Sequence, residues 1–151
     1  MSLGSADPYL GKKVSVSAFA EKVEMPAKVV AVLRGIVPDR NMDLIPQPSR
    51  AIRAGDIHEI ILTDQDAAPG SSVGRVAYLA FVEFQCGGVL LYGDRIYRDG
   101  EPIGELLGYD LSHFPNHMNV VVRGELKSGE ERGLRPGDTL VFTSNRAMAH
   151  S

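Results

Sequence analysis

Residues 108–119 hold the densest cluster of side chains that could take part in chemistry. The segment reads Gly-Tyr-Asp-Leu-Ser-His-Phe-Pro-Asn-His-Met-Asn, and it contains two of the four histidines of the chain, His113 and His117. Pro115 lies between them, and a proline breaks the interior of a helix. We therefore expect a loop that carries Asp110, His113, Asn116, His117 and Asn119.

Three roles for this loop are compatible with its residue types. Asp110, His113 and His117 offer nitrogen and oxygen ligands for a divalent transition metal, with coordination positions left for water or substrate. Without a metal, the same three residues are the candidate catalytic groups, with a histidine as general acid or base and with Asn116 and Asn119 orienting a ligand. In a structural role, these side chains would instead satisfy the backbone amides of the loop.

A second candidate region is the proline-rich stretch 38–50 together with Arg53. Its arginines could bind a carboxylate or phosphate through paired hydrogen bonds. The alternative is that they are ordinary solvated side chains, whose ion pairs contribute little. Arg53 stands beside a Gly-Asp turn, which favours a structural role for it. The candidate ligand-binding residues of this stretch are Arg40, Asn41, Asp43 and Arg50.

The elements that must position these groups are short strands. Sixteen glycines and nine prolines are scattered along the chain and divide it into short segments rich in β-branched residues, which favours strands over helices. Residues 75–84 are apolar on both alternating faces and are predicted to form the central strand. Asp99-Gly100 predicts a two-residue hairpin turn. With seven to nine strands in all, and one helical turn near 128–134, the sequence predicts a small closed or partly open β-barrel.

Two five-residue segments repeat each other 82 residues apart. Residues 52–56 read Ile-Arg-Ala-Gly-Asp and residues 134–138 read Leu-Arg-Pro-Gly-Asp. Residues 134–142, Leu-Arg-Pro-Gly-Asp-Thr-Leu-Val-Phe, resemble the GD box of the cradle-loop barrels, and this resemblance implies a barrel fold. The alternative is that Gly-Asp pairs arise by chance in a glycine-rich chain, as Gly93-Asp94 suggests. A fainter likeness to the archaeal riboflavin kinases depends on Pro115 and Asn119 alone.

Composition limits the class of protein. The chain has 151 residues and a formal net charge of −3, which disfavours nucleic acid as a partner. No apolar run approaches the roughly 20 residues that a membrane span needs. Cys86 is the single cysteine, so no internal disulfide can form, and we expect a cytoplasmic protein. We predict a leader at 1–10, one barrel domain at 11–144 and a flexible tail at 145–151.

Together these patterns predict a barrel that binds a small polar or anionic molecule between the 110–119 loop and residues 40–53. Whether it catalyses a reaction is left open. One alternative is a non-catalytic homo-oligomeric module whose apolar strands are completed by subunit contacts. A further alternative is an enzyme that depends on a divalent metal held by Asp110, His113 and His117.

Overall fold

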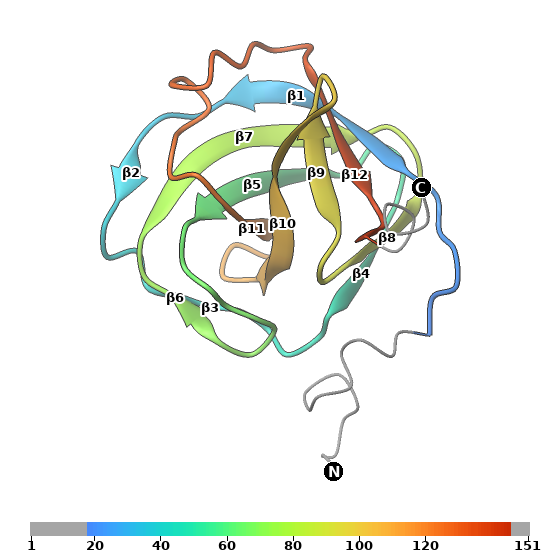
Figure 1. Cartoon of the computed structure of the whole chain (residues 1–151), viewed down its shortest axis with the longest axis horizontal. Helices are drawn as coiled ribbons and strands as arrows, with labels where there is room; N and C mark the ends of the chain where they lie inside the picture. The colour runs from blue at the N-terminus through green and yellow to red at the C-terminus, as the bar shows by residue number, and fades with distance from the viewer. Residues whose placement is uncertain (1–17, 146–151) are drawn as a thin grey trace.

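The computed structural model describes residues 18–145, which form a closed β-barrel (Figure 1). Seven strands close the ring in the order β1-β12-β9-β10-β11-β5-β7 and back to β1, and β2 pairs with the first two residues of β7. The predicted mainly β barrel is thus confirmed, whereas the predicted leader and residues 146–151 of the predicted tail lie outside the described residues. The strands are β1 (Met25–Val32), β2 (Ile36–Val37), β3 (Met42–Asp43), β4 (Ser49–Ile52), β5 (Ile57–Thr63), β6 (Ser72–Val73), β7 (Val76–Phe84), β8 (Gly88–Leu91), β9 (Arg95–Arg98), β10 (Glu101–Asp110), β11 (Asn119–Gly124) and β12 (Thr139–Thr143).

The central strand predicted at 75–84 is confirmed as β7, which pairs with β1, β2 and β5. Successive side chains of a strand point to opposite faces, and an irregularity in the pairing with β5 between Tyr78 and Ala80 shifts this alternation, so β7 contributes to both sides of the sheet. Ala80, Val82 and Phe84 belong to the main core inside the barrel. Val76 belongs to a second apolar cluster. Burial on both faces explains why this strand is apolar throughout.

The second cluster lies on the outside of the barrel, under an arm made of β3 and β6. Met42 of β3 pairs with Val73 of β6, and both pack with Leu44 against Ile61 and Val121 of the barrel wall. The two strands of the arm lie together at the lower edge of Figure 1. The proline-rich stretch 38–50 therefore contains strand residues, namely β3 and the first two residues of β4.

The predicted hairpin at Asp99-Gly100 is confirmed. Arg98 of β9 faces Glu101 of β10 across a two-residue turn, and both turn residues have positive φ, 51° at Asp99 and 80° at Gly100. This is the backbone that a tight hairpin needs in order to match the twist of its strands.

The repeated Gly-Asp segments form the same turn. In residues 53–56 the amide of Arg53 donates to Oδ2 of Asp56 at 2.9 Å, and Gly55 has a φ of 91°. Its amide donates to the carbonyl of Phe84, whose own amide donates back to the carbonyl of Asp56. The turn is therefore closed by its own aspartate, and it also forms hydrogen bonds with both backbone groups of Phe84 in β7.

The other two Gly-Asp pairs repeat this pattern of hydrogen bonds. The turn at 135–138 forms hydrogen bonds with both backbone groups of Val29, and the turn at 91–94 does the same with Leu106. The glycines again have positive φ, 99° at Gly137 and 91° at Gly93. Gly93-Asp94, which the sequence suggested to be a chance occurrence, is thus a third copy of the same turn. Each copy directly precedes a barrel strand, namely β5, β9 or β12.

The single helical turn predicted near 128–134 is present as one turn that does not continue into a helix: the segment consists of turns, and the amide of Arg132 donates to the carbonyl of Ser128, as in one turn of an α-helix. Ser128 and Glu131 each bond to the backbone amide of the other, at 2.9 and 3.2 Å. This reciprocal pair normally starts a helix, but Gly133 follows with a φ of 70° and ends the segment after one turn. Within residues 18–145 there is no helix of the length and hydrophobicity that a bilayer crossing requires.

Candidate ligand-binding cleft

An open cleft of about 440 Å³ lies where β4, the 53–56 turn and the start of β5 meet the loop before β11. This volume is within the range of small-molecule sites. The polar or charged side chains on its walls are Arg50, Arg53, Asp56, His58 and Asn116. The loop therefore contributes one wall, and the segment that the sequence marked for its arginines contributes the other.

His58 is held by the backbone of the opposite wall. It pairs in register with Val82, a residue of the main core, so its side chain lies on the inner face of β5. The amide of Met118 donates to His58 Nδ1 at 3.0 Å. Burial lowers the pKa of His58 below its usual value of 6.5, with the charges of His117 and Arg50 assisting and Asp56 opposing. The ring is therefore neutral near pH 7, with its proton on Nε2.

The two arginines of the cleft come from neighbouring elements. Arg50 lies in β4, with its guanidinium carbon 5.6 Å from the centre of the Phe114 ring. This cation–π contact links the two walls of the cleft. Arg53 occupies the first position of the Gly-Asp turn, and its backbone is fixed by Asp56. Arginine side chains on such a fixed backbone can present their donors to one bound anion.

The segment that leads into β4 is tied to β10. The amide of Ile45 donates to the carbonyl of Tyr109, and the Tyr109 hydroxyl donates to the carbonyl of Pro48 at 3.3 Å. Leu44 packs over Gly108, where a Cβ would lie only 3.2 Å from the leucine side chain. These contacts hold residues 44–48 against β10, and the chain then continues into β4, where Arg50 borders the cleft.

A row of buried polar side chains crosses the outer face beside the cleft. Asp110, Asn119 and Glu59 are in register on the adjacent strands β10, β11 and β5, and each is less than a tenth exposed. Oδ2 of Asp110 accepts from Asn119 Nδ2 at 2.8 Å and from Ser112 Oγ at 2.6 Å. We call Asp110, Asn119 and Glu59 the polar row.

His117 covers the Glu59 end of the polar row. Its Nε2 lies 3.3 Å from Glu59 Oε1, and its Nδ1 lies 2.7 Å from Asn116 Nδ2. The ring packs edge-on against Phe81 and stacks on His113. A carboxylate that faces one ring nitrogen orients the imidazole, as in general-base catalysis. Here the other nitrogen faces Asn116, which is part of the cleft wall.

A family model described as a family of unknown function (DUF6917) matches residues 19–143. The chain belongs to the DUF6917 family. Comparisons with curated proteins and with solved structures found no match.

The metal set predicted from sequence is not assembled in this DUF6917 chain. Among residues 18–145, no three His, Cys, Asp or Glu side chains converge as a metal site. Asp110 is engaged with Asn119 and Ser112, whereas His113 and His117 stack ring on ring, with 5.2 Å between centroids and 24° between planes.

The residues predicted from stretch 38–50 separate into three places in the DUF6917 fold. Arg50 borders the cleft. Arg40 lies close enough to Glu59 that its charge lowers the pKa of that carboxyl. Asn41 and Asp43 belong to the arm: Asn41 Nδ2 donates to the carbonyl of Asp39, and Asp43 Oδ1 accepts from Ser72 Oγ at 2.6 Å.

Sequence reasoning did not assign His58, Glu59 or Phe114 to the site. It gave Arg53 a structural role, which its turn supports, but the residue also borders the cleft. The signal for the pair at 58 and 59 was their place at the start of a β-branched strand, where neighbours point to opposite faces. Strand alternation predicts one residue toward the core and one toward the outside, but it does not say what each meets.

Proposed function

We propose that the protein binds a small anionic molecule in the cleft, with the barrel as the rigid frame for the binding groups. The observation that carries the proposal is that Arg50, Arg53 and the neutral His58 border the same cleft. Guanidinium groups pair with carboxylates and phosphates through two parallel hydrogen bonds. A neutral imidazole adds an N–H donor.

The charge balance of the cleft supports an anion. Asp56 is the one acidic residue among the described lining residues, and its Oδ2 already accepts the Arg53 amide. Asn116 adds an amide group at the rim. Two arginines and one carboxylate leave the described lining residues with one positive charge in excess, and the neutral His58 adds a further donor.

The test is a titration of ¹⁵N-labelled protein with phosphate, acetate and an aromatic carboxylate at constant ionic strength. We expect amide shifts concentrated at residues 50–58 and 113–118. Arg50→Gln and Arg53→Gln should each weaken binding about tenfold, because a hydrogen bond to a charged group contributes about 1.5 kcal/mol or more.

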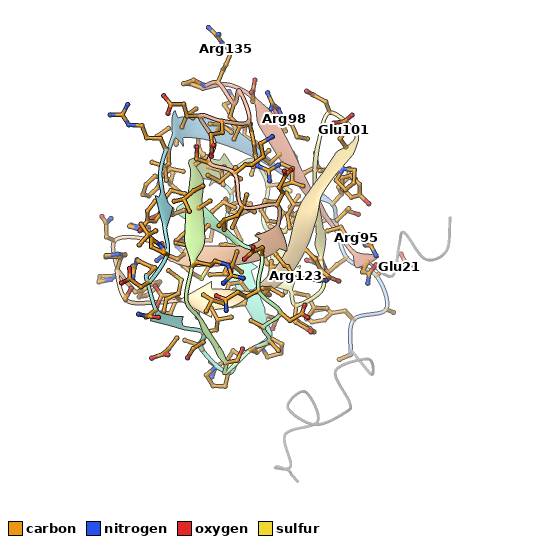
Figure 2. The ribbon with its side chains drawn as sticks, turned by 60° about the vertical axis from the view of Figure 1, so that its left-hand side comes forward. Glu21, Arg95, Arg98, Glu101, Arg123 and Arg135 are labelled. Carbon is orange, nitrogen blue, oxygen red and sulfur yellow. The ribbon has the colours of Figure 1, made fainter. Side chains whose placement is uncertain are left out.

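Arg135→Gln is the matched control. Arg135 occupies the same position in its turn as Arg53, with the same amide bond to an aspartate at 2.9 Å, but it lies outside the cleft. Figure 2 shows its side chain directed away from the ribbon at one end of the molecule. Equal losses for Arg53→Gln and Arg135→Gln, or shifts spread over the whole surface, would contradict the proposal.

A further inference from the structure

The cleft has apolar walls as well as charged ones. Five large hydrophobic side chains are exposed among the described residues, and two of them, Ile57 at 45% and Phe114 at 50%, border the cleft. They come from the start of β5 and from the loop before β11. A molecule between these walls would remove apolar surface from water, which is favourable in proportion to the area covered.

The apolar and cationic groups are next to each other. The Arg50 guanidinium lies over the Phe114 ring, 5.6 Å from its centre. A ligand anion that pairs with Arg50 is therefore brought to the edge of the aromatic side chain. A group bonded to that anion can then lie along Phe114.

The volume of the cleft also favours a ligand that is larger than a bare anion. The cleft measures about 440 Å³, while a water molecule occupies roughly 30 Å³ of the liquid. A bare inorganic anion is comparable in size to a few waters, so it would leave most of this space to solvent. A ligand with an apolar part beside its anionic group would fill this space and contact the apolar side chains at the cleft.

We propose that the ligand is an aromatic acid, with its anionic group at Arg50, Arg53 and His58 and its flat apolar body between Phe114 and Ile57. This inference rests on the proposed function, since it assigns a chemical class to the anion bound there. The simplest probe is benzoate, which joins one carboxylate to one ring.

The test compares three probes by ¹⁵N–¹H NMR titration of the full chain: benzoate, acetate and benzyl alcohol. Acetate has the charge without the ring, and benzyl alcohol has the ring without the charge. We expect benzoate to bind at least about tenfold more tightly than either, because each half adds its own contribution. Its shifts should map to residues 50–58 and 113–118.

Each other outcome identifies the step that fails. Equal affinity for acetate and benzoate would overturn the aromatic class but leave an anion site, and with it the proposed function. Equal affinity for benzyl alcohol and benzoate would show an apolar cleft without an anion site, so both ideas would fail. No shift at the cleft with any of the three probes would also reject both.

Variants separate the ring contact from the charge contact. Phe114→Ala should lower the affinity for benzoate about tenfold and change that for acetate by less than about twofold. Ile36→Ala is the matched control, since Ile36 is 44% exposed but lies on β2. Equal weakening of benzoate and acetate by Phe114→Ala would overturn the assignment of the ring site. Circular dichroism of each variant checks that the barrel is retained.

Discussion

His117 Nε2 and Glu59 Oε1 lie 3.3 Å apart in a part of the molecule where both side chains are only 11% exposed. The distance suits an ion pair, but it does not give His117 Nε2 a hydrogen bond of good geometry. Within residues 18–145, the buried side-chain atoms that lack a hydrogen-bond partner are His117 Nε2 and Asn119 Oδ1. Glu59 is next to both residues, since its Oε1 is 3.3 Å from His117 Nε2 and it is in register with Asn119 on the adjacent strand.

A protonated Glu59 offers a donor as well as an acceptor, and these are the two kinds of group that the unpaired atoms need. Its hydroxyl could donate to Asn119 Oδ1, and its other oxygen could accept from His117 Nε2. Burial raises the pKa of Glu59, while His117, His113 and Arg40 oppose the rise. The two unpaired atoms support the direction of the shift, because an ionised carboxylate cannot donate to the asparagine oxygen.

The first prediction concerns the pH dependence of stability. A raised carboxyl pKa stabilises the folded state below the unfolded value of about 4.5, and this contribution is lost as the pH rises through the folded pKa. Glutamine has the donor and acceptor of a protonated glutamate at every pH. Glu59→Gln should therefore match the natural protein near pH 4.5 and exceed it by about 1 kcal/mol near pH 7, measured by urea denaturation.

Glu101→Gln controls for the loss of one negative charge, because Glu101 is exposed at the start of β10. It should change stability little at either pH. If Glu59→Gln were less stable than the natural protein near pH 7, the ionised pair with His117 would be the favoured form, and a protonated Glu59 would be excluded.

The second prediction concerns His58. Because burial lowers its pKa below 6.5, the neutral ring contributes stability above that value, and the contribution is lost as the pH falls toward the folded pKa. Long-range ¹⁵N–¹H spectra should show an Nε2–H tautomer that persists below pH 6.5. Benzoate in the cleft should raise the midpoint, since an adjacent anion favours the charged ring. A midpoint at 6.5 that benzoate does not move would contradict this account.

Much of the fold could be predicted from local patterns. The hairpin at Asp99-Gly100 and the two-sided strand at 75–84 each carry their signal within about ten residues. The Gly-Asp turns were only partly foreseen, because the copy at 91–94 lacks the arginine that marks the other two. Its geometry depends on glycine and aspartate alone, and these are the residues that the turn requires.

The candidate site depends on contacts between residues far apart in sequence, which no local sequence pattern reveals. Glu59 meets Asn119 through the parallel pairing of β5 with β11, 60 residues away in sequence. The register of that pairing is decided by packing across the whole barrel, and a shift by one residue would exchange the faces of His58 and Glu59. The sequence thus led to the two segments that border the cleft, but not to the strand between them.

The third prediction concerns the buried pair of Lys22 and Asp94. Their side chains are 7% and 2% exposed, with Nζ 2.6 Å from Oδ2. Burial raises the pKa of Asp94, and Lys22 and the Leu91 amide oppose the rise. Lys22→Met leaves the carboxylate buried without its cation, so we expect a loss of about 3 kcal/mol in urea denaturation near pH 7.

A second substitution tests whether charge is the cause. Adding Asp94→Asn to Lys22→Met removes the unpaired charge but keeps an oxygen for the Leu91 amide, so part of the loss should be recovered. Lys28→Met, on the exposed side of β1, should have little effect. A double variant no more stable than Lys22→Met would show that packing of the lysine stem, not its charge, accounts for the loss.

The last prediction uses the threefold repetition of the Gly-Asp turn. At Gly55, Gly93 and Gly137 the φ angles lie between 91° and 99°, and an added Cβ would meet no atom within 4 Å. Alanine at each position therefore suffers only the backbone penalty for a left-handed conformation, about 1–2 kcal/mol. The three single variants should lose similar stability in urea denaturation, and asparagine should lose less, because it adopts this conformation more readily. Strongly unequal losses would show that the three turns, despite their identical hydrogen bonds, do not contribute equally to closing the barrel.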